Sequence, residues 1–192
     1  MNHKKKFKKN KIAFIFCFLF GLLSQTIAAQ NQQAVSHTEH HKNSFSILVG
    51  HAHISQGIQN EKTKWLALPS WMMSYNRSLS KKWSIGIHTD IIIEDFVVQD
   101  LSRNAEEGAI IERSYPISLV AATTFKPIHQ LGIIAGVGIE YAEEETFTLV
   151  RLGLEPNIKI NSKYEVIFNL SYDLKFNAYD NWNLGVGIVR IF

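Results

Sequence analysis

The chain has almost no cysteine, no long apolar run beyond its N-terminal region and almost no helical periodicity. Its only cysteine, Cys17, lies within the first 29 residues, so the rest of the chain forms no disulfide and has no thiol chemistry. No apolar run of about 18 residues follows, which excludes a membrane-spanning helix there. Because exposed backbone cannot remain unsatisfied in lipid, any membrane span must consist of paired strands.

The first 29 residues have the pattern of a secretory signal peptide. A lysine-rich start precedes the apolar run 12–23, and Ala28 and Ala29 mark the cleavage region. The alternative is an N-terminal membrane anchor, but an anchor needs about 20 apolar residues and this run is shorter. Cys17 has no Leu-x-Gly before it, so a lipoprotein is not expected.

Export changes the charge of the protein. The precursor has 20 basic and 17 acidic residues, and loss of the six lysines in the signal peptide leaves 14 basic residues against the same 17 acidic ones. The positive precursor charge is therefore no argument for a nucleic-acid partner, and none is expected. Residues 30–43 are polar and aperiodic and include His37, His40 and His41, which predicts a disordered leader before a single domain, 44–192.

From residue 44 onward, apolar and polar residues alternate, and this period of two predicts strands. Longer polar loops are predicted at 56–64 and 97–113, and the other connections are short. Proline cannot donate to a strand ladder, so bulges are expected at Pro69 and Pro116. The eight predicted strands are 45–54, 65–76, 83–94, 114–125, 131–141, 146–158, 164–175 and 182–192.

The apolar parity of these strands is almost free of charge. Arg190 is the exception, and its long side chain can reach the membrane interface. All eight glycines within the strands fall on the opposite, charged parity, where they would make room for large polar side chains in a narrow lumen. A soluble lipocalin-like barrel would have the apolar parity inside, and parity alone does not distinguish it from a transmembrane barrel. The glycines favour the transmembrane barrel, because a solvent-facing surface gives no reason to favour glycine.

Aromatic residues of the apolar parity collect at strand ends, as in the two aromatic girdles of a transmembrane barrel. The girdle expected at the periplasmic edge is Phe45, Tyr75, Trp83, Phe125, Tyr164 and Phe192. The girdle expected toward the outer edge is Trp65, Tyr115, Tyr141, Tyr172 and Trp182. The connections fit this orientation, because the periplasmic turns are short and two outer loops are long.

The last strand, WNLGVGIVRIF, resembles the insertion signal of bacterial outer-membrane barrels. It has a terminal aromatic residue, Phe192, a glycine five residues earlier, Gly187, and apolar residues at alternate positions; Arg190 departs from the signal. The whole pattern resembles the small eight-stranded barrels of the outer-membrane protein A transmembrane-domain type. This resemblance implies an all-β, antiparallel, up-and-down transmembrane β-barrel in the cell outer membrane of a Gram-negative bacterium. It also implies contact with outer-membrane lipid and lipopolysaccharide and insertion by the barrel-assembly machinery, but no particular activity.

Charged residues of the inward parity form the first candidate site, a polar network in the lumen. Its predicted members are His88, Asp90, Glu94, Glu140, Arg151, Glu155, Glu165, Asp173 and Lys175. Buried charges are paired because unpaired ones are costly. We therefore expect a plugged, structural interior, and a narrow channel is the alternative, although eight strands leave little open space.

His51 and His53 form the second candidate site. They lie two residues apart on one strand, so their side chains share a face and could chelate zinc or copper. The alternative is a pair of interfacial histidines among lipid headgroups.

An enzyme that deacylates or acylates lipid A is the third candidate function. Such an enzyme needs a nucleophilic serine or an acid–base histidine near the outer leaflet. His53 and Ser55, or His88, Asp90 and Glu94, make no recognisable signature, so no catalytic residue and no cofactor are predicted. The expected role is structural or interactive at the cell surface through the outer loops, whose composition names no partner.

Overall fold

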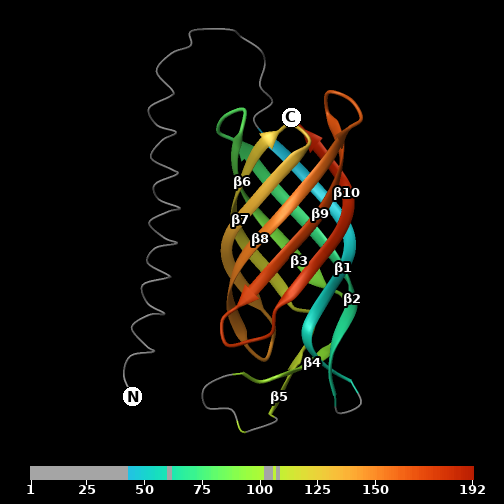
Figure 1. Cartoon of the computed structure of the whole chain (residues 1–192), viewed down its shortest axis with the longest axis vertical. Coiled ribbons are helices and arrows are strands. Elements are labelled where there is room, and N and C mark those ends of the chain that lie inside the picture. The colour runs from blue at the N-terminus through green and yellow to red at the C-terminus, as the bar shows by residue number, and fades with distance from the viewer. Residues whose placement is uncertain (1–42, 60–61, 102–105, 107–108) are drawn as a thin grey trace, which may run out of the picture. The chain divides into compact units, whose positions relative to one another are not determined.

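A computed structural model describes residues 43–59, 62–101, 106 and 109–192 (Figure 1). The predicted signal peptide and leader lie outside these residues, apart from Asn43. Among the described residues, no helix is long and apolar enough to cross a membrane. The strands are β1 (Asn43–Gln59), β2 (Lys62–Ser78), β3 (Trp83–Ile92), β4 (Phe96–Gln99), β5 (Ile110–Arg113), β6 (Ile117–Ile128), β7 (Leu131–Tyr141), β8 (Thr146–Lys159), β9 (Tyr164–Lys175) and β10 (Asn181–Ile191).

Eight of these strands form one closed antiparallel barrel. The strands β1, β2, β3, β6, β7, β8, β9 and β10 pair in chain order, and β10 returns to β1. This closing seam runs from Ser44 opposite Ile191 to Ile54 opposite Asn181. Closure leaves no free strand edge in the wall, as a barrel in lipid requires. The prediction of an all-β, eight-stranded, up-and-down barrel is confirmed.

The two ends of the barrel differ, as the top and bottom of Figure 1 show. We call the upper end the turn end, because it carries the short connections 79–82, 129–130 and 160–163 and the C-terminal residue. The opposite end, the loop end, carries the connections 142–145 and 176–180 and the β4–β5 hairpin.

Both segments predicted as long polar loops contain strands. β1 runs on to Gln59 and β2 begins at Lys62, so most of 56–64 is a paired hairpin. Within 97–113, β4 and β5 pair with each other, and Val98 of β4 lies opposite Gly57 of β1. The apolar runs of β4 and β5 are only two or three residues long, too short for a period to be recognised beside their polar neighbours.

The prediction of bulges at Pro69 and Pro116 is wrong. The register shifts of the wall lie instead at 54–57 and 125–128. Pro69 sits where β3 has ended, and its carbonyl still accepts from the amide of Ile93 at 3.0 Å. Pro116 precedes β6. Both prolines thus occupy positions where the ladder needs no donor from them. The backbone departs from the extended conformation beside Pro116, where Tyr115 has a φ of 44°, but this lies before β6 begins.

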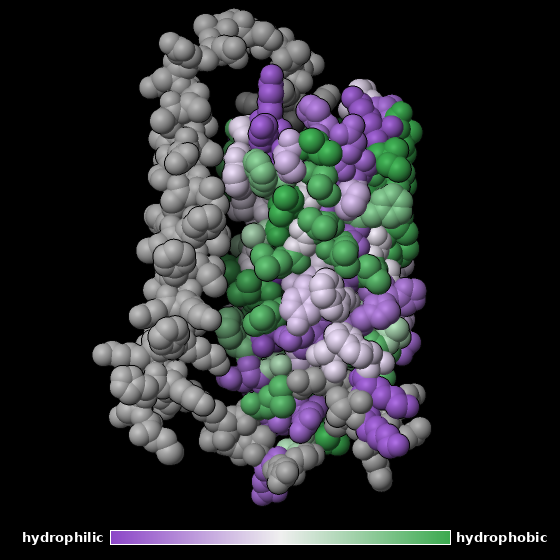
Figure 2. Space-filling model, in the orientation of Figure 1, coloured by the Kyte–Doolittle hydropathy of each residue, from purple (hydrophilic) through white to green (hydrophobic). Residues whose placement is uncertain are grey.

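The outward face of the barrel wall is apolar along every strand. Its exposed members include Ile47, Met73, Ile87, Leu119, Val137, Leu152, Phe168 and Val186. Figure 2 shows apolar side chains running along the wall and hydrophilic ones gathering toward the two ends. Charged residues such as Asp90, Arg151 and Asp173 are buried inside. The lipocalin-like alternative, with the apolar parity inside, is therefore wrong, and an exterior of this extent fits lipid rather than water.

Outward aromatic side chains lie in belts near both ends. At the turn end, the ring centroids of Trp83 and Phe125 are 4.7 Å apart. At the loop end, those of Tyr172 and Trp182 are 4.6 Å apart. Each pair joins neighbouring strands at the level where an aromatic ring can meet both lipid and water. The belts occur where the sequence predicts the girdles.

Some inward glycines face side chains, as predicted: a Cβ atom on Gly86 would meet the side chain of Asn76, and one on Gly132 that of Thr124. Two others instead allow a neighbouring strand to approach closely. A Cβ atom on Gly187 would lie 2.0 Å from the carbonyl oxygen of Ile47, and one on Gly138 would lie 2.2 Å from that of Leu119. These glycines therefore accommodate backbone of the adjacent strand rather than large polar side chains. Gly187 packs at the closing seam, and its role in an insertion signal with Phe192 stays a prediction.

Candidate functional site

One guanidinium joins three strands at the centre of the lumen. Arg151 of β8 donates to both carboxylate oxygens of Asp90 on β3, at 2.7 and 2.5 Å. It also donates from Nε and Nη2 to Asp173 on β9, at 2.6 Å each. All three side chains are buried. The planar fork of arginine suits two carboxylates at once, and full hydrogen bonding offsets the cost of burying the charges.

A second ion-pair cluster lies at the loop end. Glu140 of β7 pairs with Arg113 of β5 at 3.0 Å and with Lys175 of β9 at 3.1 Å. The hydroxyl of Tyr179 donates to the same carboxylate, and burial raises the pKa of this phenol well above its usual value, which keeps it protonated. Arg113 also donates to the carbonyl of Glu145 at 2.6 Å. The cluster thus attaches the β4–β5 hairpin to the barrel rim.

Aromatic and aliphatic side chains fill the space beside this cluster. The ring centroids of Phe96 and Phe147 lie 5.6 and 6.2 Å from that of Tyr179, both edge-on. The guanidinium of Arg113 lies 4.5 Å from the Phe147 ring centroid, and the amine of Lys175 lies 4.0 Å from that of Tyr179. The buried members of this layer are Ala52, Ile54, Ile92, Phe96, Val98, Phe147 and Tyr179. Side chains therefore fill the lumen at the loop end.

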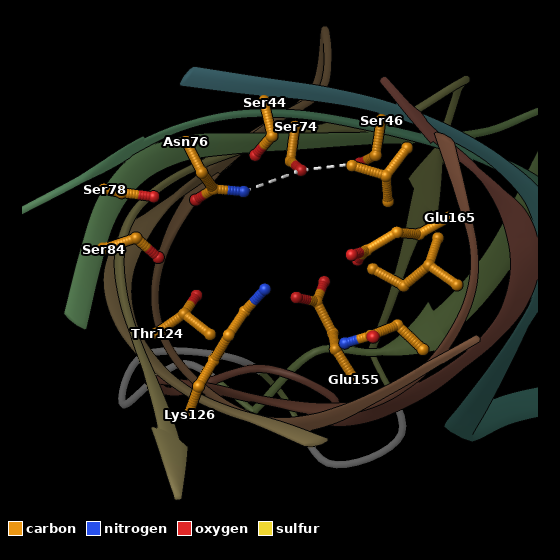
Figure 3. Close-up of a pocket in the computed structure, with 13 residues that line it drawn as sticks. Ser44, Ser46, Ser74, Asn76, Ser78, Ser84, Thr124, Lys126, Glu155 and Glu165 are labelled. Carbon is orange, nitrogen blue, oxygen red and sulfur yellow. Dashed lines mark hydrogen bonds between the residues drawn. The ribbon is translucent and has the colours of Figure 1, made fainter. Parts of the chain in front are cut away.

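A polar cavity of about 50 Å³ lies at the turn end, with room for a few water molecules (Figure 3). Lys126, Glu155 and Glu165 point into it from three strands, and most of the remaining wall consists of serine and asparagine side chains. Among the described residues, the buried hydroxyl of Thr124 finds no hydrogen-bond partner there. The turn end of the lumen is therefore polar and suited to water, unlike the packed loop end.

Seven of the nine residues predicted for the lumen network are buried, and two are not. Glu165 is half-buried and lines the cavity. Glu94 is exposed, which contradicts its predicted place in the lumen. β3 ends at Ile92, so the strand alternation no longer orients the side chain of Glu94. The buried residues are His88, Asp90, Glu140, Arg151, Glu155, Asp173 and Lys175.

His51 and His53 lie on the outward parity of β1, near the loop end. They stand opposite Pro69 and Ala67 of β2, and His51 is exposed while His53 is half-buried. In the described part of the chain, no three His, Cys, Asp or Glu side chains are grouped so that they could hold a metal ion. The histidines of the predicted leader lie outside that part. Metal binding by His51 and His53 stays a prediction.

The residues considered for catalysis are held in separate contacts. The hydroxyl of Ser55 accepts from the backbone amide of Asp180 at 3.0 Å. Nε2 of His88 lies 3.0 Å from Oδ1 of Asn76, and Asp90 binds the central guanidinium. Across the residues that the structure describes, no serine hydroxyl is hydrogen-bonded to a histidine, which is the pairing that activates a serine nucleophile.

The lumen also has members that the sequence does not predict. Arg113 and Tyr179 lie in segments predicted as loops, so no parity assigns them to the interior. Asn181 and Asn183 lie on the inward parity of β10, and Asn183 donates to Asp173 at 3.0 Å. Their alternation with apolar neighbours is a signal by which these two asparagines could be found from the sequence.

The comparisons with known proteins return likenesses of structure. No protein-family model and no curated protein matches the sequence. The attachment invasion locus protein Ail of Yersinia pestis is 13% identical with a TM-score of 0.48, over 77% of this chain and 97% of that one. Neisserial surface protein A is 10% identical with a TM-score of 0.47, over 78% and 97%. The outer membrane protease OmpT of Escherichia coli is 10% identical with a TM-score of 0.42, over 83% and 99%.

These TM-scores are all below 0.5, so the class of the protein is argued from its own geometry. The closed ladder of eight strands, the apolar exterior, the charged interior and the two aromatic belts define a transmembrane β-barrel of the outer-membrane type. Its location is the cell outer membrane.

Proposed function

We propose that this barrel has a structural or surface-interaction role at the cell surface and catalyses no reaction. The observation that carries the proposal is the sheet that continues past the barrel wall at the loop end. β1 pairs with β10 only as far as Ile54, and beyond this point β4 lies beside β1 where Val98 faces Gly57. The resulting order is β5-β4-β1-β2. A paired sheet anchored to a packed rim is a rigid support for recognition.

The exposed side chains of this extension support an interactive role. Ile110 of β5 is 59% exposed, and Lys64 and Glu112 are exposed on the same extension. Apolar side chains among charges of both signs suit a polar-rimmed contact with a partner protein. The composition of the extension does not select one partner.

Single cysteines offer a direct test, because Cys17 is the only native one. A cysteine in place of Lys64, on the extension, should react with a membrane-impermeant maleimide on intact cells. A cysteine in place of Lys81, at the turn end, should react only after the outer membrane is permeabilised. The reverse pattern would put the extension in the periplasm and refute a role at the cell surface.

A narrow channel and a lipid-modifying enzyme make different predictions from the proposed role. Because side chains fill the loop end, the reconstituted protein should show no conductance steps in a planar bilayer. Overexpression should leave the mass spectrum of lipid A unchanged. Stepwise conductance would favour the channel, and a new lipid A species that disappears in the S55A or H53A variant would favour the enzyme.

A further inference from the structure

Exposed basic side chains gather at the turn end of the barrel, whereas most exposed acids lie at the loop end, beside the exposed Lys62 and Lys64. The exposed basic side chains at the turn end are Arg77, Lys81, Lys82, Lys159, Lys163 and Arg190. Exposed acidic side chains at the loop end include Glu94, Asp95, Glu112, Glu143, Glu144 and Glu145. The described acids nearest the turn end, Glu155 and Glu165, point into the lumen cavity. The outer surface of the turn end is therefore positive.

Five of these basic residues form an arc across the closing seam, which we call the basic arc. In order around the rim, they are Lys163, Arg190, Arg77, Lys81 and Lys82. The amide of Ile191 donates to the carbonyl of Lys163 at 2.8 Å, so the β8–β9 turn lies beside the end of β10. On the other side of β1, Arg77 stands opposite Asn43. Lys159 is not counted in the basic arc, because it stands opposite the acidic residue Glu165 on β9.

Arg190 has no anionic partner among the described residues. It lies on the outward parity, opposite the exposed aromatic residues Phe45 of β1 and Tyr164 of β9. Among the described residues, neither Arg190 nor any other member of the basic arc takes part in an ion pair. A charge at this level of a bilayer is costly unless its side chain reaches the interface, where it meets water and lipid headgroups. Lipid phosphate is the anion present there.

We propose that the basic arc binds the phosphate groups of anionic phospholipids in the leaflet around the turn end. The guanidinium groups of Arg77 and Arg190 match phosphate oxygens in a two-pronged geometry, and the turn lysines add charge. Between the two arginines, Tyr75 and Phe192 lie 6.5 Å apart between ring centroids and supply an aromatic surface for the glycerol region of the lipid. This site is independent of the surface role proposed for the loop end.

Lipid competition in nanodiscs tests the proposal. The full mature protein is placed in phosphatidylcholine discs with graded amounts of phosphatidylglycerol, and the retained lipids are counted by native mass spectrometry. The R77Q/R190Q variant should bind phosphatidylglycerol about 30-fold more weakly, which corresponds to roughly 1 kcal/mol for each basic side chain at an anionic surface. The R77K/R190K variant keeps the charge but loses the two-pronged geometry, so its affinity should lie between those of the wild type and R77Q/R190Q.

The matched control is K62Q/K64Q, which removes the same charge from the loop end. Unchanged binding in R77Q/R190Q, or an equal loss in K62Q/K64Q, would overturn the proposal. A dependence on Arg77 and Arg190 that appears for lipopolysaccharide and not for phosphatidylglycerol would also overturn it. The K81Q/K82Q variant leaves the strands untouched and should show a loss in the same direction, so the test does not depend on the arginine variant folding.

Discussion

At the scale of residues, the most consequential contact is the one between Arg151 and its two carboxylates. Asp173 stands directly opposite Arg151 on the neighbouring strand, whereas Asp90 reaches it from across the lumen. One guanidinium faces two carboxylates, so the three side chains together carry one negative charge. Asn183 donates a hydrogen bond to the carboxylate of Asp173. The arginine therefore holds together groups that would otherwise repel each other across a narrow interior.

Replacing Arg151 with methionine should lower the free energy of unfolding by about 3–5 kcal/mol, because two carboxylates then remain buried without a cation. Urea titration in lipid vesicles, followed by tryptophan fluorescence, measures the change. The R151M/D90N/D173N variant has the same shape without charge and should recover most of the stability. A triple variant as unstable as the single one would show that the lost packing of Arg151, not its charge, sets the effect.

The inward position of Arg151, Asp90 and Asp173 can be predicted from the sequence, since a strand fixes alternate side chains on opposite faces. Their partners cannot, because the pairing of Arg151 with Asp90 depends on how far β3 lies from β8 across the closed barrel. Glu94 is an exception, because the alternation of apolar and polar residues continues in the sequence beyond Ile92, at which β3 ends.

At the scale of elements, glycines on the same strand have unlike neighbours. A Cβ atom on Gly187 would meet backbone atoms, the Ile47 oxygen at 2.0 Å and the Leu48 Cα at 2.6 Å. A Cβ atom on Gly185 would first meet the flexible end of Met72, at 2.8 Å. Backbone cannot move without disturbing the seam between β1 and β10, whereas a methionine end can rotate away.

The G187A variant should therefore be less stable than the wild type by about 1–3 kcal/mol, as for an overpacked interior. The G185A variant, on the same strand, should change stability by less than about 1 kcal/mol. Both are measured by urea unfolding after refolding into vesicles, where no assembly machinery takes part. Equal losses in the two variants would contradict the close approach of β1 at Gly187.

Arg113 adds a buried ion pair to the contacts that attach the β4–β5 hairpin to the barrel. Replacing Arg113 with glutamine removes its ion pair with Glu140, and amide exchange in β4 and β5 should become at least about tenfold faster while the barrel strands stay protected. Hydrogen–deuterium exchange with mass spectrometry measures this. E112Q alters an exposed neighbour on the same strand and serves as the control; equal acceleration in E112Q would argue against Arg113 as the attachment.

Element positions follow from the sequence where strands are long. Residues 131–141 and 164–175 are predicted with the bounds that β7 and β9 have. The β4–β5 hairpin is not predicted, because each of its strands has four residues and is stabilised by packing on β1 and by Arg113 rather than by a periodic pattern of its own. Tertiary contacts of this kind are not visible in local sequence.

At the scale of the whole molecule, the two ends of the barrel differ in structure and charge. The closed wall fits a bilayer, the packed loop end carries a sheet extension and exposed acids, and the turn end carries the basic arc. A residue pattern with period two predicts the two faces of the wall, and the burial of the charged side chains shows that the polar face is inside. The apolar exterior then determines the solvent, which is lipid.

The central claim is that the chain is a closed barrel in the outer membrane, and one measurement tests it most directly. Cells that express the protein are fractionated, and each fraction is run on a gel with and without boiling. We predict enrichment in the outer-membrane fraction and a heat-dependent shift in mobility, because a closed barrel resists unfolding by detergent until heated. A soluble periplasmic protein whose mobility does not change on boiling would contradict the account.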